Sequence, residues 1–263
     1  ESDTMFTTWA IAWVIHALKT NPLHLFDANI FYPVQNTLAL SESNIGLGLL
    51  GLPFSFFTND ALLILNIVFL FVLILSPIAM SLLVYEYTKN RWAGWIGGLL
   101  FGFSVFRYAR FHTLQFLAFF PTIFALLFFH RFLHSGRQRD AILFALFFIF
   151  QVVTSLYLGY FALWLFVFYI MGVLFWHRFR LKRDFWKGIA IAGTTIAVFL
   201  VLFLRPYLSH QEQTNLRRDK GLVEMFAATP ADFLATRLDR SNKLYQYFFD
   251  NGWHFLGDES TYE

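Results

Sequence analysis

Two carboxylate residues, Glu1 and Asp3, stand directly before an apolar stretch at 5–18. A carboxylate in this position can take a proton from a hydroxyl nucleophile. A pair of carboxylates can also hold a hard divalent cation such as Mg²⁺ or Mn²⁺. The structural interpretation is a solvated helix start, because the helix dipole stabilises negative charge there. The local sequence alone favours the structural interpretation, since two carboxylates near a helix N-terminus are common.

Two arginines, Arg107 and Arg110, follow an apolar run at 92–106. That run of about 15 residues is roughly 22 Å long as a helix, short of the roughly 30 Å hydrocarbon core. The arginines therefore either snorkel to the head groups or face a polar cavity at membrane depth. A guanidinium matches phosphate oxygens. With His112 and Gln115 close by, the segment is predicted to bind a lipid phosphate or pyrophosphate.

Three further residues are candidate substrate contacts. Asp27 lies in the proline-bounded segment 22–33, which is predicted to be irregular, and it can equally be structural. Glu42 can contact a ligand or simply cap the helix that follows it. Tyr157, in the short connection 155–160, can contact a substrate, although an ordinary aromatic belt is favoured. The chain has no Gly-rich phosphate loop, H-E-x-x-H or nucleophile elbow, so soluble nucleotide chemistry is not indicated.

The composition is that of an integral membrane protein. Hydrophobic residues make up 57% of the 263 residues and charged residues only 14%, with 36 Phe and 8 Trp. A soluble domain is about a quarter charged. The basic residues sit in short loops between apolar runs, which indicates a bilayer partner and no nucleic acid. The absence of Cys excludes disulfides and thiolate metal sites.

The apolar runs predict an all-α helix bundle with about six spanning helices. Residues 58–60 are expected to cap the first span and Pro77 to kink it. Gly94, Gly98 and Gly102 recur at spacing four, which predicts a face that a neighbouring helix can approach closely. Pro121 is expected to interrupt the third span. The predicted spans are 61–87, 92–109, 113–133, 139–154, 156–176 and 185–204.

Charge asymmetry predicts the orientation of these spans. Ten Lys and Arg lie in the connections 88–92, 131–140 and 177–187, against three in 1–58 and the alternate connections. The apolar stretch 45–57 has 13 residues, too few to span, so it is predicted to be re-entrant or interfacial. The basic loops then share the cytoplasmic side, as the positive-inside rule requires.

The predicted organisation has three parts. The first is a non-cytoplasmic loop over 1–58, in which 5–18 and 45–57 form interfacial helices. The second is the transmembrane bundle over 59–205. The third is a polar tail over 206–263 on the same side as the first loop. This arrangement brings every candidate site residue to one face.

The layout resembles the GT-C class of integral-membrane glycosyltransferases, in which an acidic motif and interfacial helices follow a first spanning helix. The segments FDANIFYP (26–33), TLALSE (37–42), GLPFSF (51–56) and SVFRYARFHTLQ (104–115) are similar to an uncharacterised bacterial subgroup of these proteins. The resemblance covers nearly all of 1–205. It implies that a first helix precedes Glu1, so that the chain is a fragment of a seven-span module in the bacterial cytoplasmic membrane.

The resemblance also implies a reaction and roles for individual residues. A sugar on a polyprenyl phosphate would be transferred to an acceptor at the non-cytoplasmic face, with Asp3, and secondly Glu1, activating the acceptor. Arg107 and Arg110 would hold the donor phosphate by position and chemistry. The alternative is a non-catalytic scaffold or lipid-binding subunit of a larger membrane complex. A transporter would need paired broken helices in two repeats, and the sequence has no such symmetry.

Overall fold

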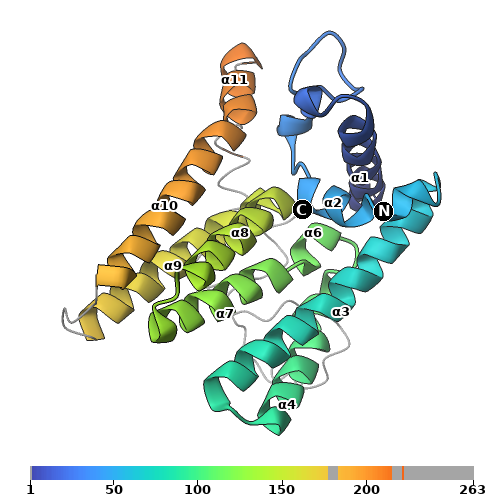
Figure 1. Cartoon of the computed structure of the whole chain (residues 1–263). Coiled ribbons are helices and arrows are strands. Elements are labelled where there is room, and N and C mark those ends of the chain that lie inside the picture. The colour runs from blue at the N-terminus through green and yellow to red at the C-terminus, as the bar shows by residue number, and fades with distance from the viewer. Residues whose placement is uncertain (1, 177–182, 215–220, 222–263) are drawn as a thin grey trace, which may run out of the picture. The chain divides into compact units, whose positions relative to one another are not determined.

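The computed structural model describes residues 2–176, 183–214 and 221. The chain divides into two compact units, Glu1–Gln213 and Thr214–Glu263, and nearly all described residues belong to the first. Within the described residues every regular element is a helix, as predicted (Figure 1). Of the predicted tail 206–263, only the part in α11 (Arg205–Thr214) and residue 221 is described.

Four helical segments of the described chain are long and apolar enough to cross a membrane. Two of the six predicted spans are shorter helices, α4 (Arg91–Gly102, 12 residues) and α8 (Gln138–Thr154, 17 residues). The first candidate span is α3 (Ala61–Thr88), and the second is Leu114–Ser135, which contains α6 (Leu114–Leu117) and α7 (Phe120–Ser135). The third is Leu156–Phe175 of α9 (Leu156–Trp176). The fourth is Arg183–Ser209, which contains α10 (Arg183–Phe203) and the first part of α11.

Two predicted spans are broken, which corrects the sequence interpretation. The helix expected over 92–109 ends at Gly102, and α5 (Val105–Ala109) starts anew after Ser104, whose carbonyl accepts from the Arg107 and Tyr108 amides. In the third span the break falls between α6 and α7, and Pro121 is the second residue of α7. Proline is tolerated in a first turn because its missing N–H has no helical partner there. Pro121 therefore begins a helix and does not interrupt one.

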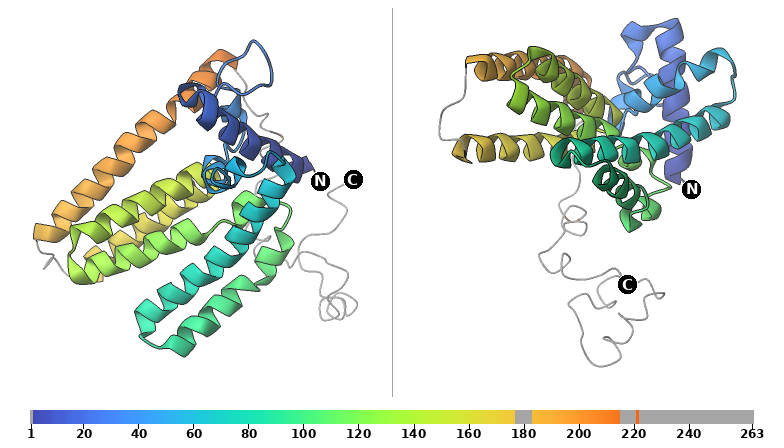
Figure 2. Two further views of the ribbon diagram at one scale, coloured as in Figure 1. Left: turned by 45° about the vertical axis from the view of Figure 1, so that its right-hand side comes forward. Right: turned by 60° about the horizontal axis from the view of Figure 1, so that its bottom comes forward.

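Helices α3 and α4 form a tight hairpin, with the two helices side by side in Figures 1 and 2. The start of α3 is capped as predicted, because Asp60 Oδ1 accepts from the Leu62 and Leu63 amides. The predicted glycine face is also confirmed. A Cβ at Gly94 would lie 2.8 Å from the Ser81 carbonyl oxygen, and one at Gly98 would lie 2.8 Å from the Pro77 carbonyl oxygen.

This close approach predicts that Gly98→Ala destabilises the hairpin by about 1–3 kcal/mol, the usual cost of overpacking. The matched control is Gly193→Ala in α10, where an added Cβ meets nothing within 4 Å. The control is expected to be neutral or slightly stabilising, since Ala favours helix over Gly. Thermal unfolding in detergent, followed by tryptophan fluorescence, measures both. Equal unfolding temperatures for the two variants would contradict the close-packed seam.

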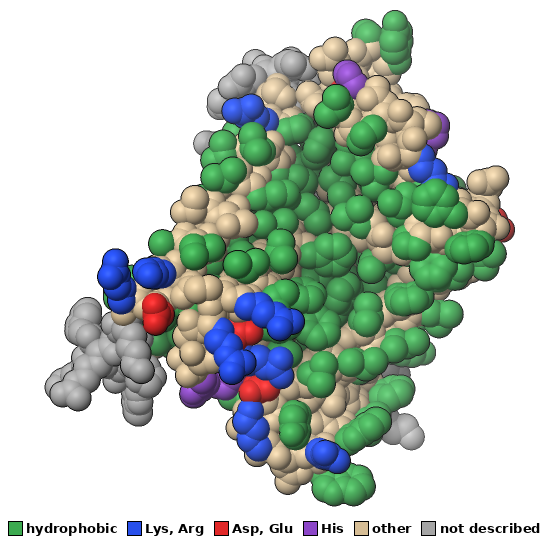
Figure 3. Space-filling model, in the orientation of Figure 1, with side chains coloured by type: hydrophobic (Ala, Val, Ile, Leu, Met, Phe, Trp, Pro, Cys, Tyr) green, Lys and Arg blue, Asp and Glu red, His purple; other side chains and the backbone are tan. Residues whose placement is uncertain are grey.

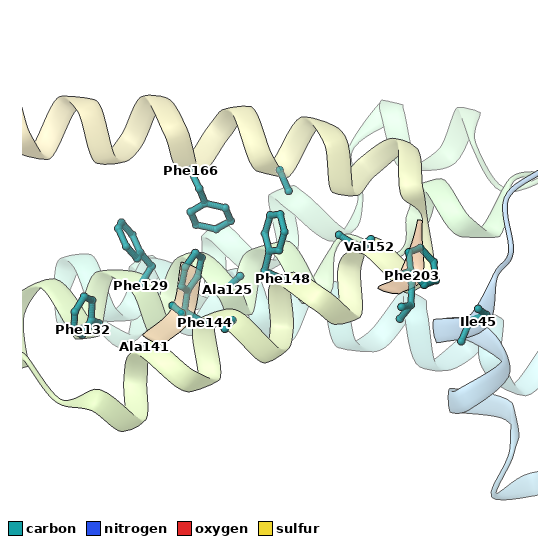
Figure 4. Close-up of a cluster of buried hydrophobic side chains, with 14 of the residues drawn as sticks. Ile45, Ala125, Phe129, Phe132, Ala141, Phe144, Phe148, Val152, Phe166 and Phe203 are labelled. Atoms are coloured by element: carbon teal, nitrogen blue, oxygen red, sulfur yellow. The ribbon is translucent and has the colours of Figure 1, made fainter. Parts of the chain in front are cut away.

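The second half of the bundle is held by aromatic side chains from α7, α8 and α9. The ring centroid of Phe144 lies 5.0 Å from that of Phe129 and 4.7 Å from that of Phe166 (Figure 4). Helix α10 packs on α8, and Phe203 belongs to the same buried cluster. The Phe144 and Phe166 rings pack edge to face, whereas the Phe129 and Phe144 rings are tilted at 48°. Both pairs fill the space between helices without polar atoms.

The first loop contains α1 (Ser2–Thr20), α2 (Ile45–Gly51) and three 3-10 turns at Pro22–His24, Thr37–Leu40 and Phe54–Phe56. Helix α2 has seven residues and is about 10 Å long, so the stretch 45–57 does not span. Helix α2 packs against α1, α3 and α8. A Cβ added at its three glycines would clash with Thr154 of α8, Val14 of α1 and Ile64 of α3.

Candidate functional site

The N-terminal end of α1 lies against the connection that follows α5. The Thr4 hydroxyl donates to the His112 carbonyl oxygen at 3.3 Å. The Thr7 hydroxyl donates to the Asp3 carbonyl oxygen at 2.8 Å and lies 3.4 Å from Gln115 Oε1. Asp3 is exposed in the first turn of α1, immediately before Thr4. Two segments 108 residues apart thus meet at one place, and Asp3 belongs to the helical turn that makes this contact.

A cavity of about 180 Å³, here called the α1–α3 cavity, opens at this contact. Its polar lining comes from Asn66 of α3, from Thr4 and Thr7 of α1, and from His112. Its apolar lining includes the rings of Phe69 and Phe111, whose centroids are 5.6 Å apart. The cavity is lined by Thr4, Thr7, Leu65, Asn66, Phe69, Phe111, His112 and Leu114. Polar groups beside an apolar wall suit a ligand with a polar head and a hydrocarbon part.

His112 lines the α1–α3 cavity, and Arg110 lies one residue before the lining residue Phe111; both Arg110 and His112 are exposed. Among the described residues, the Arg110 guanidinium makes no hydrogen bond and no ion pair. The turn is fixed by its backbone, because the Thr113 hydroxyl and amide both donate to the Arg110 carbonyl oxygen. Because the turn is fixed and the Arg110 guanidinium has no partner in the described part of the chain, this group can bind a phosphate without first breaking a contact there.

Arg107 lies elsewhere than predicted. Its side chain is only 1% exposed and points into the bundle. Nη1 donates to the Leu117 carbonyl oxygen at 2.9 Å, and Nη2 donates to the Val72 carbonyl oxygen at 3.4 Å. The guanidinium also lies over the Phe101 ring, 5.4 Å from its centroid. The predicted role of Arg107 as a substrate ligand therefore disagrees with this geometry, in which Arg107 ties α5 to α3 and α6.

Glu42 also has a partner inside the fold. Its Oε2 accepts from the Leu156 amide at 2.8 Å, and its Oε1 accepts from the Tyr157 amide at 3.0 Å and the Ser155 hydroxyl at 3.4 Å. Glu42 thus caps α9 from the first loop and does not cap the helix that follows it. Burial raises the pKa of this carboxyl, although the three hydrogen bonds oppose the rise.

Glu42→Ala is expected to lower the free energy of unfolding by about 1–3 kcal/mol, because two amides of α9 lose their acceptor. The raised pKa adds a pH dependence. The folded chain binds this proton more tightly, so the contribution is fully present below the ordinary pKa of 4.5 and is lost as pH rises through the folded pKa. Glu42→Gln should remove that dependence. Unfolding temperatures of the three proteins between pH 4 and pH 8 test this, and identical pH profiles would refute it.

The other two predicted contacts are separate from the α1–α3 cavity lining. Asp27 accepts from the Asn36 amide at 2.8 Å and pairs with His24 Nδ1 at 2.8 Å, so it holds its own loop together. Partial burial favours a higher pKa for Asp27, but these partners hold the pKa below its ordinary value. Tyr157 is exposed, and its ring packs 5.5 Å from that of Phe116.

The predicted carboxylate pair can be followed only at Asp3, because Glu1 lies outside the described residues. Within the described part of the chain, no group of three or more His, Cys, Asp or Glu side chains is placed to hold a metal ion. The divalent cation considered for this pair would thus need Glu1 or ligands from the substrate.

One protein family has a model that matches residues 7–238, and it is described as a domain of unknown function (DUF6311). The chain belongs to this family. No curated protein and no solved structure matches it. The matched range includes the α1–α3 cavity from Thr7 onward, together with Arg110 and His112, whereas Asp3 and Thr4 precede it.

Sequence reasoning missed three polar residues of this site, namely Thr4, Thr7 and Asn66. A signal for them was present. Thr4 and Thr7 are three positions apart and therefore share one helix face. Asn66 is the single amide in the apolar run of α3, and a polar side chain within a spanning segment usually faces a partner or a cavity.

Proposed function

We propose that the chain is an inverting glycosyltransferase of the GT-C kind, which moves a sugar from a polyprenyl phosphate to an acceptor hydroxyl. The observation that carries the proposal is the contact of Thr4 with the His112 carbonyl oxygen. It brings the first turn of α1, with Asp3, beside the Arg110 turn at a cavity of mixed polarity. The sequence resemblance to GT-C enzymes supports the same assignment.

The proposed topology has six spans: α3, α4 with α5, α6 with α7, α8, α9, and α10 with α11. The α3–α4 and α7–α8 hairpins support it, because each joins adjacent antiparallel helices. Lys and Arg side chains gather around these two hairpin ends (Figure 3). The positive-inside rule places that end in the cytoplasm of a bacterium, and the α1–α3 cavity then faces the other side. Exposed Phe56 and Phe57 suit contact with the bilayer surface.

The proposed reaction is a single displacement. The Asp3 carboxylate takes the proton of the acceptor hydroxyl, and the hydroxyl oxygen attacks the anomeric carbon. The bond between that carbon and the phosphate oxygen breaks, and the electron pair leaves with the polyprenyl phosphate. Arg110 and His112 bind the phosphate and stabilise its added charge. Arg107 acts as a positioning residue, since it anchors α5 and hence the Arg110 turn.

The proposal is tested by placing the full chain in vesicles with a panel of polyprenyl-phosphate sugars and a membrane extract as acceptor source. The expected result is acceptor-dependent release of polyprenyl phosphate and a product of inverted anomeric configuration. If no donor in the panel is consumed, although each reaches the vesicle surface, the enzymatic assignment is wrong.

A second candidate function is a non-catalytic scaffold or lipid-binding subunit of a larger membrane complex. The observation that favours it is the use of Arg107 and Glu42 inside the fold. The α1–α3 cavity of about 180 Å³ is also smaller than the roughly 300–1,000 Å³ of ordinary ligand sites. Saturable binding of a polyprenyl phosphate without any turnover would favour this function over transfer.

A further inference from the structure

A larger cavity, of about 540 Å³, lies at the basic end of the helices and is here called the α7–α8 cavity. It is formed by the end of α3, the end of α7 and the start of α8. Three arginines line it, Arg131, Arg137 and Arg139. The proposed glycosyl transfer makes no use of this cavity, because its residues are at the opposite end of the spans from the α1–α3 cavity.

The two acids of the α7–α8 cavity already have partners. Glu86 Oε2 accepts from Arg131 Nε and Nη2 at 2.9 and 2.7 Å, and Glu86 Oε1 pairs with Lys89. Asp140 accepts from the Ser135 hydroxyl at 2.9 Å. By contrast, the guanidinium groups of Arg137 and Arg139 have no hydrogen-bond or ion-pair partner within the described residues. The cavity therefore presents two free cationic forks, which suit the oxygens of a phosphate.

One wall of the same cavity is apolar. Phe128 and Leu143 line it, and the Arg131 guanidinium lies over the Phe128 ring, 5.8 Å from its centroid. The apolar wall continues along α7 and α8, because Phe147 stacks on Phe128 at 5.5 Å and meets Phe124 at 4.9 Å. These three rings are half-buried. Figure 3 shows hydrophobic side chains directly beside the cluster of Lys and Arg.

We propose that the α7–α8 cavity binds the head group of an anionic phospholipid from the leaflet at the basic end. Arg137 and Arg139 contact the phosphate, and an acyl chain lies along Phe128, Phe147 and Phe124. A soluble phosphate would use only the cationic side and gain nothing from the aromatic wall. Basic pockets between spanning helices are a recurring way to hold anionic lipids on the cytoplasmic side.

The test is native mass spectrometry of the full chain released from vesicles of phosphatidylglycerol and phosphatidylcholine in equal amounts. The unmodified protein is expected to retain phosphatidylglycerol in preference. R137A/R139A is expected to retain on the order of tenfold less, while the control R91A/K187A, which removes two exposed charges of the same end outside this cavity, stays within about twofold. R137K/R139K keeps the charge and is expected to recover part of the binding.

Three outcomes would overturn the proposal. The first is equal retention of the two lipids by the unmodified protein, which needs no variant and so does not depend on folding of one. The second is an equal loss in R137A/R139A and R91A/K187A, which would mean a general effect of surface charge. The third is displacement of the lipid by millimolar inorganic phosphate, which would identify a soluble anion as the ligand.

Discussion

Asp3→Asn is expected to lower the rate of sugar transfer by about 10²–10⁴-fold, the usual contribution of a general base. The amide has nearly the same shape as the carboxylate but cannot take the proton of the acceptor hydroxyl. Asp3 is exposed, and the contact that fixes this turn uses its carbonyl oxygen and not its side chain. Stability should therefore fall by no more than about 0.3–1 kcal/mol, the contribution of a negative charge at a helix N-terminus.

The matched control for this variant is Asp184→Asn. Asp184 is likewise an exposed aspartate in the first turn of its helix, but it lies at the opposite, basic end of the bundle. The control should transfer sugar at the unmodified rate. Release of polyprenyl phosphate in vesicles measures the rate, and unfolding temperature checks the fold. Full transfer by Asp3→Asn would remove Asp3 from the mechanism.

Arg107→Ala is expected to lower stability, whereas Arg110→Ala is expected to weaken donor binding. Arg107 donates two charge-assisted hydrogen bonds to carbonyl oxygens inside the bundle, so its loss should cost about 2–4 kcal/mol of unfolding free energy, from the lost bonds and the space left behind. Arg110 is exposed, so its loss should leave stability unchanged and raise the donor KM by about tenfold, through one lost phosphate contact.

Thermal unfolding and donor titrations of the same two preparations separate these effects. Arg107→Lys provides a further comparison, because an ammonium keeps the charge but lacks the planar fork whose two Nη atoms reach separate carbonyl oxygens. Its stability is expected to fall between those of the unmodified protein and Arg107→Ala. A stable Arg107→Ala protein with a raised donor KM would show that Arg107 binds the substrate directly.

The bounds of a helix could be predicted well where polar residues bound an apolar run. The predicted helix 61–87 differs from Ala61–Thr88 by one residue, because the Asp60 cap marks its start. The glycine face of α4 could also be predicted, since small residues four positions apart lie on the same face of a helix. Both features depend only on residues close together in the sequence.

The candidate site could be predicted only in part, because its key contacts join distant segments. The orientation of Arg107 depends on the carbonyl oxygens of Leu117 at the end of α6 and of Val72 within α3, and Val72 is 35 positions away in the sequence. Glu42 caps amides more than a hundred positions away. The charge asymmetry predicts which segments share a side of the membrane, but no local pattern in the sequence indicates which of these segments touch.

The most direct measurement of the central claim is photo-crosslinking of the full chain in vesicles with a polyprenyl phosphate that carries a diazirine near the phosphate. If the α1–α3 cavity is the donor site, the label should fall on peptides from 2–20 and 105–117, and unlabelled polyprenyl phosphate should compete for it. Labelling confined to 128–147, or labelling that no competitor reduces, would contradict the assignment of the donor site.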